Sequence, residues 1–356
     1  HCARNARRAG QLDEADDYLH TCRELGGSTA PVVLERLLLT AQRGDFVEVE
    51  EALRGRFRPD RPEGLLIAEV MSWSLMRANR FHEAREYLDY WLQRRPDDVE
   101  ALVRRAWVAE HLFDFKGSLD DYLRVLELAP ERDPVRLRVA EILMQTMQTT
   151  AAAPYLEELS RRRPTDPAVR LCSARCQRRR GHNDEARRTL DALLTDAPAD
   201  AQVLGERGAL ALQEDDMTQA ERWLRQARRS APLDRPINYS LLLCLQRLGK
   251  TDEAEEVRRT LEQIDADHTR LRELFTEVMR HPHDADLRFE TAGIFLRHGL
   301  RQDGLRWLQT AIEVDPHHRA SHEALARYYE EEGQTELAAQ HRRLVKQMTA
   351  RPAQTP

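Results

Sequence analysis

The sequence predicts an all-α protein, a right-handed α-solenoid of about ten short helix hairpins. Hydrophobic residues make up 41% and charged residues 33% of the 356 residues, a balance typical of amphipathic helices that bury one stripe and expose the rest. No Gly/Ser-rich or Pro-rich linker divides the chain, so one continuous architecture has to account for its length. A recurring turn is the third observation, and it sets the boundaries of the hairpins.

The turn recurs about every 34 residues, which is a period of helix-hairpin repeats. Most turn positions are glycines, and each is expected to join the first helix of a hairpin to the second. Only the step from Gly249 to Gly299 is much longer, at 50 residues. The turns are, in order, Gly10, Gly44, Asn79, Phe113, Met147, Gly181, Asp215, Gly249, Gly299 and Gly333.

Small residues recur on both sides of most turns, where the two helices of a hairpin have to approach closely. Five places after the turn stand Ala15, Val49, Ala84, Ser118, Ala152, Ala186, Ala220, Ala254, Gly304 and Ala338. Seven places before it stand Ala3, Ser72, Ala106, Ala140, Ala174, Gly208, Ala292 and Ala326. Most units then close with a proline that cannot continue the second helix: Pro96, Pro130, Pro164, Pro198, Pro232, Pro282 and Pro316.

The long step after Gly249 predicts one lengthened helix near residues 252–281, because no Gly or Pro interrupts it and apolar residues continue at helical spacing. A kink near Asp265 to Asp267 is the alternative. We expect a single solenoid over residues 1–347, with its first repeat truncated at the N-terminus, and a disordered tail over residues 348–356.

This register resembles the tetratricopeptide repeat family. The units that match it best are Ala101 to Pro130, Ala168 to Pro198, Val203 to Pro232 and Leu287 to Pro316, and the last contains GLRWLQTAIEVDP. Pentatricopeptide repeats, which read RNA, have a similar length, but the recurring small residue and the closing proline favour tetratricopeptide repeats.

The resemblance implies a concave groove lined by the first helix of each hairpin. Carried over residue by residue, the groove positions are Trp73, Val103, Arg104, Trp107, Leu137, Arg138, Glu141, Met144, Arg175, Arg178, Tyr239, Leu243 and Phe289. Exposed aromatic rings beside arginines are typical of protein-interaction hot spots. The alternative for Trp73 and Trp107 is that they seal neighbouring first helices together.

Chaperone-binding members of the family hold a C-terminal carboxylate with Lys, Asn and Arg from three successive first helices. No three successive units here supply that set, since Arg104 and Arg138 match only its final Arg place. Tails of heat-shock chaperones are therefore not expected as ligands.

The segment Arg170 to Arg180 is the strongest local cluster of positive charge. It could bind an anion, with nucleic acid as a minor possibility, or it could be a solvated face paired with carboxylates. The formal net charge of -6 provides no basic field across the whole chain, so no nucleic acid is expected as a partner.

Cysteine and histidine do not form a convincing metal site. Cys172 and Cys176 with His182 leave a tetrahedral site one ligand short, and arginines flank them. Two His pairs, 281/283 and 317/318, fall on equivalent loops, where they could form a pH-sensitive or metal-binding edge, although polar loop residues are the plainer interpretation. Cys2 and Cys22 could form a disulfide only in an oxidising compartment.

No catalytic motif is present, so we predict that the protein is not an enzyme and has no cofactor. The expected function is a scaffold that binds a protein or peptide. The alternative is self-assembly through the apolar stripe of residues 261–279. No stretch is apolar enough to span a bilayer.

The chain begins in the middle of an expected helix, so we expect a fragment of a longer protein. The resemblance suggests a bacterial protein, which is cytoplasmic, or membrane-anchored or periplasmic if an upstream segment carries a leader or anchor. The compartment is left open by the sequence.

Overall fold

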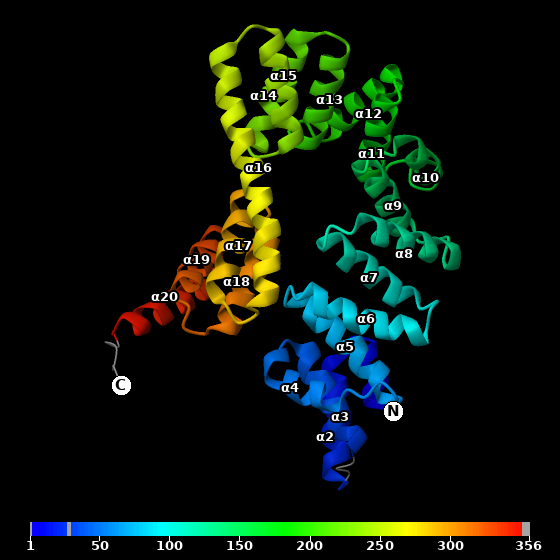
Figure 1. Cartoon of the computed structure of the whole chain (residues 1–356), viewed down its shortest axis with the longest axis vertical. Helices are drawn as coiled ribbons and strands as arrows, with labels where there is room; N and C mark the ends of the chain where they lie inside the picture. The colour runs from blue at the N-terminus through cyan, green and yellow to red at the C-terminus, as the bar shows by residue number, and fades with distance from the viewer. Residues whose placement is uncertain (1, 27–29, 351–356) are drawn as a thin grey trace. The chain divides into compact units, whose positions relative to one another are not determined.

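The computed structural model describes residues 2–26 and 30–350, and these form twenty α-helices and no strand (Figure 1). The all-α prediction is confirmed, and consecutive helices pair into the hairpins of an α-solenoid. In order, the helices are α1 (Cys2–Arg8), α2 (Leu12–Glu24), α3 (Ala30–Arg43), α4 (Phe46–Arg56), α5 (Glu63–Arg77), α6 (Phe81–Arg94), α7 (Val99–His111), α8 (Phe115–Leu128), α9 (Asp133–Gln145), α10 (Thr149–Arg162), α11 (Pro167–Arg179), α12 (Asn183–Asp196), α13 (Ala201–Gln213), α14 (Met217–Ser230), α15 (Arg235–Arg247), α16 (Thr251–Arg280), α17 (Ala285–Arg297), α18 (Arg301–Val314), α19 (Arg319–Glu331) and α20 (Thr335–Ala350).

The chain divides into two compact units. The first comprises His1–Leu128 and Ile312–Pro316, and the second comprises Ala129–Ala311 and His317–Pro356. The single solenoid over residues 1–347 stays a prediction. Of the predicted tail, residues 351–356 lie outside the described residues, and α20 continues to Ala350. No helix in the described ranges is both long and apolar enough to cross a membrane.

Every predicted turn has the left-handed backbone conformation that ends a helix. All ten positions have positive φ, and four of them are not glycine: Asn79 at 55°, Phe113 at 58°, Met147 at 62° and Asp215 at 62°. A side chain in this region costs about 1–2 kcal/mol relative to glycine. The turns predicted from the sequence are therefore the turns of the structure, and at four of them a residue other than glycine adopts a strained backbone conformation.

Replacing Met147 by glycine is expected to raise the free energy of unfolding by about 1 kcal/mol, because it removes this strain. The Met147 side chain is exposed, so little packing is lost. Urea denaturation measures the change. Met147→Ala is the matched control, because it removes the same side chain beyond Cβ but keeps the strain. If the alanine variant gains as much as the glycine variant, strain at this turn is not the cause.

The small positions are the contact between the helices of each hairpin. All ten residues five places after the turns are buried. A Cβ atom at Gly208 would lie 2.6 Å from Cγ of Leu224, and one at Gly304 would lie 2.5 Å from Cγ of Leu296. Real Cβ atoms do not approach so closely, so larger residues at these places would force the helices apart.

An Asp two residues after the closing proline caps many of the first helices. The Asp98 side chain accepts a hydrogen bond from the Ala101 N–H at 3.1 Å and so starts α7. The same arrangement starts four helices of the second unit, with caps at Asp166, Asp200, Asp234 and Asp284. Proline ends one hairpin and the Asp begins the next.

Hydrogen bonds also link the C-terminal ends of successive first helices in the second unit. Arg179 at the end of α11 donates to the Met144 carbonyl in the last turn of α9, at 2.5 Å. Gln213 of α13 donates to the Arg178 carbonyl of α11, and Arg247 of α15 donates to the Leu212 carbonyl of α13, each at 3.4 Å. Each of these carbonyls also accepts a backbone N–H from its own turn, so the following repeat adds a second donor at the helix end.

The long step is a single uninterrupted helix, which confirms the lengthened helix and not the kink. α16 runs for 30 residues, packing against α15 and then against α17 (Figure 1). Its later apolar residues contact the next hairpin, since the Phe275 ring lies 5.8 Å from the Trp307 ring and 6.4 Å from the Phe295 ring. Much of the stripe considered for self-association, residues 261–279, is therefore covered within the same chain, although Met279 is exposed.

Two buried imidazoles join α19 to α20. Nδ1 of His322 lies 2.8 Å from Nδ1 of His341, and the Tyr329 ring stacks on His341. One ring has to donate and the other to accept, so the contact needs at least one neutral imidazole. Burial, and secondly the charge of a protonated His322, lower the pKa of His341.

The free energy of unfolding is expected to fall as the pH drops below about 6.5, the ordinary pKa of histidine. In this range the unfolded chain takes up a proton at His341 while the folded chain does not, until the lowered pKa is reached. Denaturation at a series of pH values measures the slope. His341→Phe, which keeps a ring beside Tyr329, should flatten the slope, and an unchanged slope would contradict the assignment to His341.

Candidate functional site

The predicted groove residues of the first unit are half-buried on α5 and α7. The Arg77 guanidinium lies 4.8 Å from the Trp73 ring centre. Trp107 packs on His111, with ring centres 3.7 Å apart, and meets Phe81 at 5.6 Å. Each indole thus contacts side chains of its own unit over part of its surface, while part remains accessible. Val103 and Arg104 are also half-buried.

Arg104 is held within the first unit. It pairs with Glu100 at 2.9 Å, and its guanidinium lies 5.7 Å from the Trp91 ring centre. These contacts fix the orientation of the Arg104 guanidinium, while part of the side chain stays accessible to solvent.

The prediction is wrong for Met144 on α9. Leu137 and Glu141 are half-buried and Arg138 is exposed, but Met144 is only 5% exposed. Met144 lies in the last turn of α9, where Arg179 of α11 reaches over the helix end to its carbonyl. The neighbouring repeat covers this turn, so the groove face of α9 is restricted to the residues before it. There, Arg138 pairs with Glu141 at 2.8 Å.

Three of the four arginines of α11 are paired with carboxylates from the same unit, whereas Arg179 donates to the Met144 carbonyl. Glu206 of α13 accepts from Arg175 at 2.8 Å and from Arg178 at 3.0 Å. Arg170 pairs with Asp196 at 3.3 Å. The cluster of residues 170–180 therefore has the paired arrangement considered as its plainer interpretation, and an anion would have to displace Glu206.

Further along, α15 and α17 carry the remaining predicted groove residues. Tyr239 on α15 is 50% exposed, whereas Leu243 is half-buried and packs against the core of α13 to α16. Phe289 on α17 is half-buried, with its ring 5.6 Å from that of His318.

The thiols and imidazoles do not assemble into a metal site. Within residues 2–26 and 30–350, no group of three His, Cys, Asp or Glu side chains is placed to hold a metal ion. Burial raises the pKa of the Cys172 thiol to about 12, which keeps it protonated and poorly suited to ligation. Cys2 and Cys22 are both exposed and unbonded.

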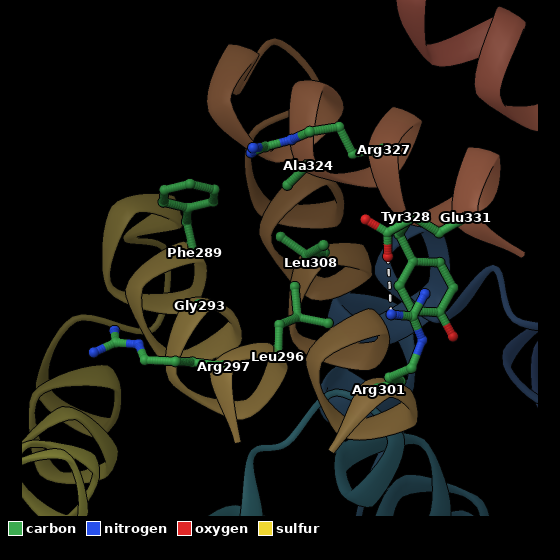
Figure 2. Close-up of a pocket in the computed structure, with 10 residues that line it drawn as sticks. All are labelled: Phe289, Gly293, Leu296, Arg297, Arg301, Leu308, Ala324, Arg327, Tyr328 and Glu331. Atoms are coloured by element: carbon green, nitrogen blue, oxygen red, sulfur yellow. Dashed lines mark hydrogen bonds and ion pairs between the residues drawn. The ribbon is translucent and has the colours of Figure 1, made fainter. Parts of the chain in front are cut away.

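Phe289 lies at a pocket of about 400 Å³ between α17 and α19, the first helices of the last two hairpins (Figure 2). Apolar side chains line it beside three arginines and one glutamate, which gives its lining a positive balance. The lining residues are Phe289, Gly293, Leu296, Arg297, Arg301, Leu308, Ala324, Arg327, Tyr328 and Glu331.

Two of the three arginines are fixed by carboxylates. Arg297 donates to Asp267 of α16 at 3.1 Å. Arg301 pairs with Glu331 at 2.9 Å, and its guanidinium lies 4.9 Å from the Tyr328 ring centre (Figure 2). Arg327 is exposed and forms no ion pair within the part of the chain that the structure describes.

Of these ten residues, only Phe289 was predicted. The groove positions carried over from the family ended at Phe289, so α19 contributed nothing to the prediction. A signal was present, because Arg327 and Tyr328 stand in the first helix of the last hairpin, where the turn frame ending at Gly333 places them.

Comparison with known proteins places these repeats in a family. Residues 70–133 and 147–206 each match a family model described as tetratricopeptide repeat. A solved tetratricopeptide repeat protein from Parabacteroides merdae ATCC 43184 shares 18% identity, with a TM-score of 0.57 over 69% of this chain and 97% of that protein. At this identity the likeness concerns the fold.

Two further solved structures are similar with lower TM-scores and carry no argument here. The human IFIT1 dimer shares 17% identity, with a TM-score of 0.45 over 98% of this chain and 89% of that one. PilW, a type IV pilus biogenesis factor, shares 15% identity, with a TM-score of 0.46 over 57% of this chain and 94% of that one. No curated protein matches the sequence at a significant level.

The two matched segments and the similar fold agree with the turn frame, the small-residue contacts and the closing prolines. Repeats of this kind generally form protein-interaction scaffolds. Residues 70–133 and 147–206 are tetratricopeptide repeats.

Proposed function

We propose that the protein is a non-enzymatic scaffold that binds a peptide segment of a partner protein on the first-helix faces of its second unit. The observation that supports this most is the pocket between α17 and α19, which opens on first helices and combines apolar and cationic lining. Pockets of this composition suit a side chain that anchors a partner.

The remaining first helices support the same proposal. Tyr239 offers an exposed ring on α15, and a rigid ring gives a large contact area at a small loss of side-chain entropy. Glu141 orients Arg138 of α9, and Glu206 orients Arg175 and Arg178 of α11. A peptide crossing them meets a polar surface with fixed geometry, which favours specificity over affinity.

A display library of random dodecapeptides, selected on the intact chain, tests the proposal. Fluorescence anisotropy then compares the selected peptides on wild type, Tyr239→Ala and Phe289→Ala. We expect at least one of the two variants to weaken binding about tenfold, as for a hot-spot residue. Thr218→Ala, an exposed change on the second helix α14, is the control and should bind as wild type does.

Failure to select any peptide would reject the proposal. So would peptides that bind equally well to wild type and to both first-helix variants, since they would be bound on another face.

A further inference from the structure

Gly293 is a glycine in the middle of α17 that packing within the chain does not explain. Glycine in a helix interior is unfavourable, so it usually marks a close approach of another group. A Cβ atom at Gly293 would meet nothing within 4 Å, and the backbone there has no positive φ. The space that the missing side chain leaves is open and belongs to the pocket between α17 and α19.

Most other glycines inside helices lie where a neighbouring group would contact a Cβ atom. A Cβ atom at Gly205 would lie 2.8 Å from Ile237, and at Gly64 it would lie 2.3 Å from the Tyr90 hydroxyl. Only Gly55, near the end of α4, shares the open surroundings of Gly293 among helical glycines of the described ranges. The open space at Gly293 therefore suits the main chain of a bound molecule.

The pocket next to Gly293 has an apolar floor. Leu308 is fully buried and Ala324 nearly so, while Leu296 is half-buried, and all three side chains line the cavity (Figure 2). Phe289 and Tyr328 line it as well, from α17 and α19. This lining is suited to an aliphatic side chain and offers no polar partner at its base.

One of the three arginines that line the pocket has no carboxylate partner among the described residues. Asp267 holds Arg297, and Glu331 with Glu332 holds Arg301. Arg327 extends from α19 toward the side of the pocket where Phe289 lies (Figure 2). Because its guanidinium is exposed and has no ion pair within residues 2–26 and 30–350, it can form a bidentate pair with an incoming carboxylate.

We propose that the pocket binds an acidic aliphatic peptide segment, with an aliphatic side chain between Leu296 and Ala324, the peptide main chain over Gly293, and a carboxylate on Arg327. This inference rests on the proposed function and specifies its partner. Glu331 at the other end of the pocket disfavours a second carboxylate there, so the segment has a defined direction.

The test uses soluble octapeptides in which one Leu is fixed and its neighbours vary among Asp, Asn and Lys. Each peptide is made with a free C-terminal carboxylate and as the C-terminal amide, so that a side-chain carboxylate is distinguished from a chain end. Anisotropy is measured on the intact chain at low and at physiological salt. We expect the Asp peptides to bind about tenfold more tightly than their Asn counterparts.

Two variants test the two halves of the pocket. Arg327→Gln should remove the preference for Asp over Asn, while Arg343→Gln, an exposed change on α20, should leave it intact. Gly293→Leu should reduce binding of all Leu-containing peptides about tenfold by filling the space. Its thermal midpoint should not fall, because the added Cβ atom meets no neighbour and leucine favours a helix more than glycine does.

The outcomes separate this inference from the proposed function. Peptides that bind wild type and Gly293→Leu equally, or that do not distinguish Asp from Asn, would overturn the pocket assignment. If such peptides still lose affinity in Tyr239→Ala, the scaffold function stands without it. If only the free-acid peptides bind, the carboxylate on Arg327 is that of a chain end. Arg327→Gln should then weaken their binding, and unchanged binding would overturn the pocket assignment.

Discussion

Replacing Ala266 by proline is expected to lower the free energy of unfolding by about 3 kcal/mol or more. Ala266 is exposed near the middle of α16, so the change removes no buried side chain. Proline there eliminates one backbone hydrogen bond of the helix and clashes with the carbonyl four residues earlier. Because α16 packs against both α15 and α17, breaking it also weakens the coupling between their hairpins.

Hydrogen exchange followed by mass spectrometry locates this effect. Amides of α16 to α20 should exchange faster, whereas those of α9 to α13 should be protected as in wild type. Thr251→Pro is the matched control, because it places proline at the first position of the same helix, where the ring is tolerated. Equal losses of stability in the two variants would mean that the centre of α16 does not hold the hairpins together.

The second large effect is expected for Leu224→Ala, which should lower the free energy of unfolding by about 2–5 kcal/mol. Leu224 is fully buried in the core that joins α13 to α16. Its removal leaves a cavity where the two helices of the hairpin meet. Leu337→Ala on α20, where the side chain is partly exposed, should cost much less, and urea denaturation compares the two.

Gly208 provides an internal check on that contact. Gly208→Ala alone should be destabilising, because its Cβ would lie 2.6 Å from Cγ of Leu224. In the Leu224→Ala background that atom is absent, so the second change should be tolerated better. The double variant should therefore be more stable than the sum of the single losses predicts. Strict additivity would contradict direct contact between these positions.

The turn frame could be predicted because it depends on local backbone chemistry. Positions such as Phe113 and Met147 were assigned as turns by spacing alone, and both have the left-handed conformation. The unbroken α16 followed in the same way from the lack of Gly or Pro between Thr251 and His281. Signals of this kind lie within one hairpin, so a single sequence carries them.

The candidate site was predicted less well because it depends on contacts between hairpins. Whether Arg175 is free to bind an anion depends on Glu206, a residue of the next first helix. The end of α9 at Met144 likewise receives a hydrogen bond from Arg179 of α11. Spacing places a residue on a helix face, but the side chain that a neighbouring repeat brings to that face is not fixed by spacing.

The hydrogen bonds from Arg179, Gln213 and Arg247 to preceding helix ends give the array a direction during synthesis. The chain emerges from the ribosome N-terminus first, so α9 is made before Arg179, which supplies an additional donor to its last turn. Shortening the protein after α13 would leave the Leu212 carbonyl without Arg247. Removing everything before α11 would instead take away the Met144 carbonyl and leave the Arg179 guanidinium to be solvated by water. Truncation from either side thus removes one of these hydrogen bonds at the new end of the array.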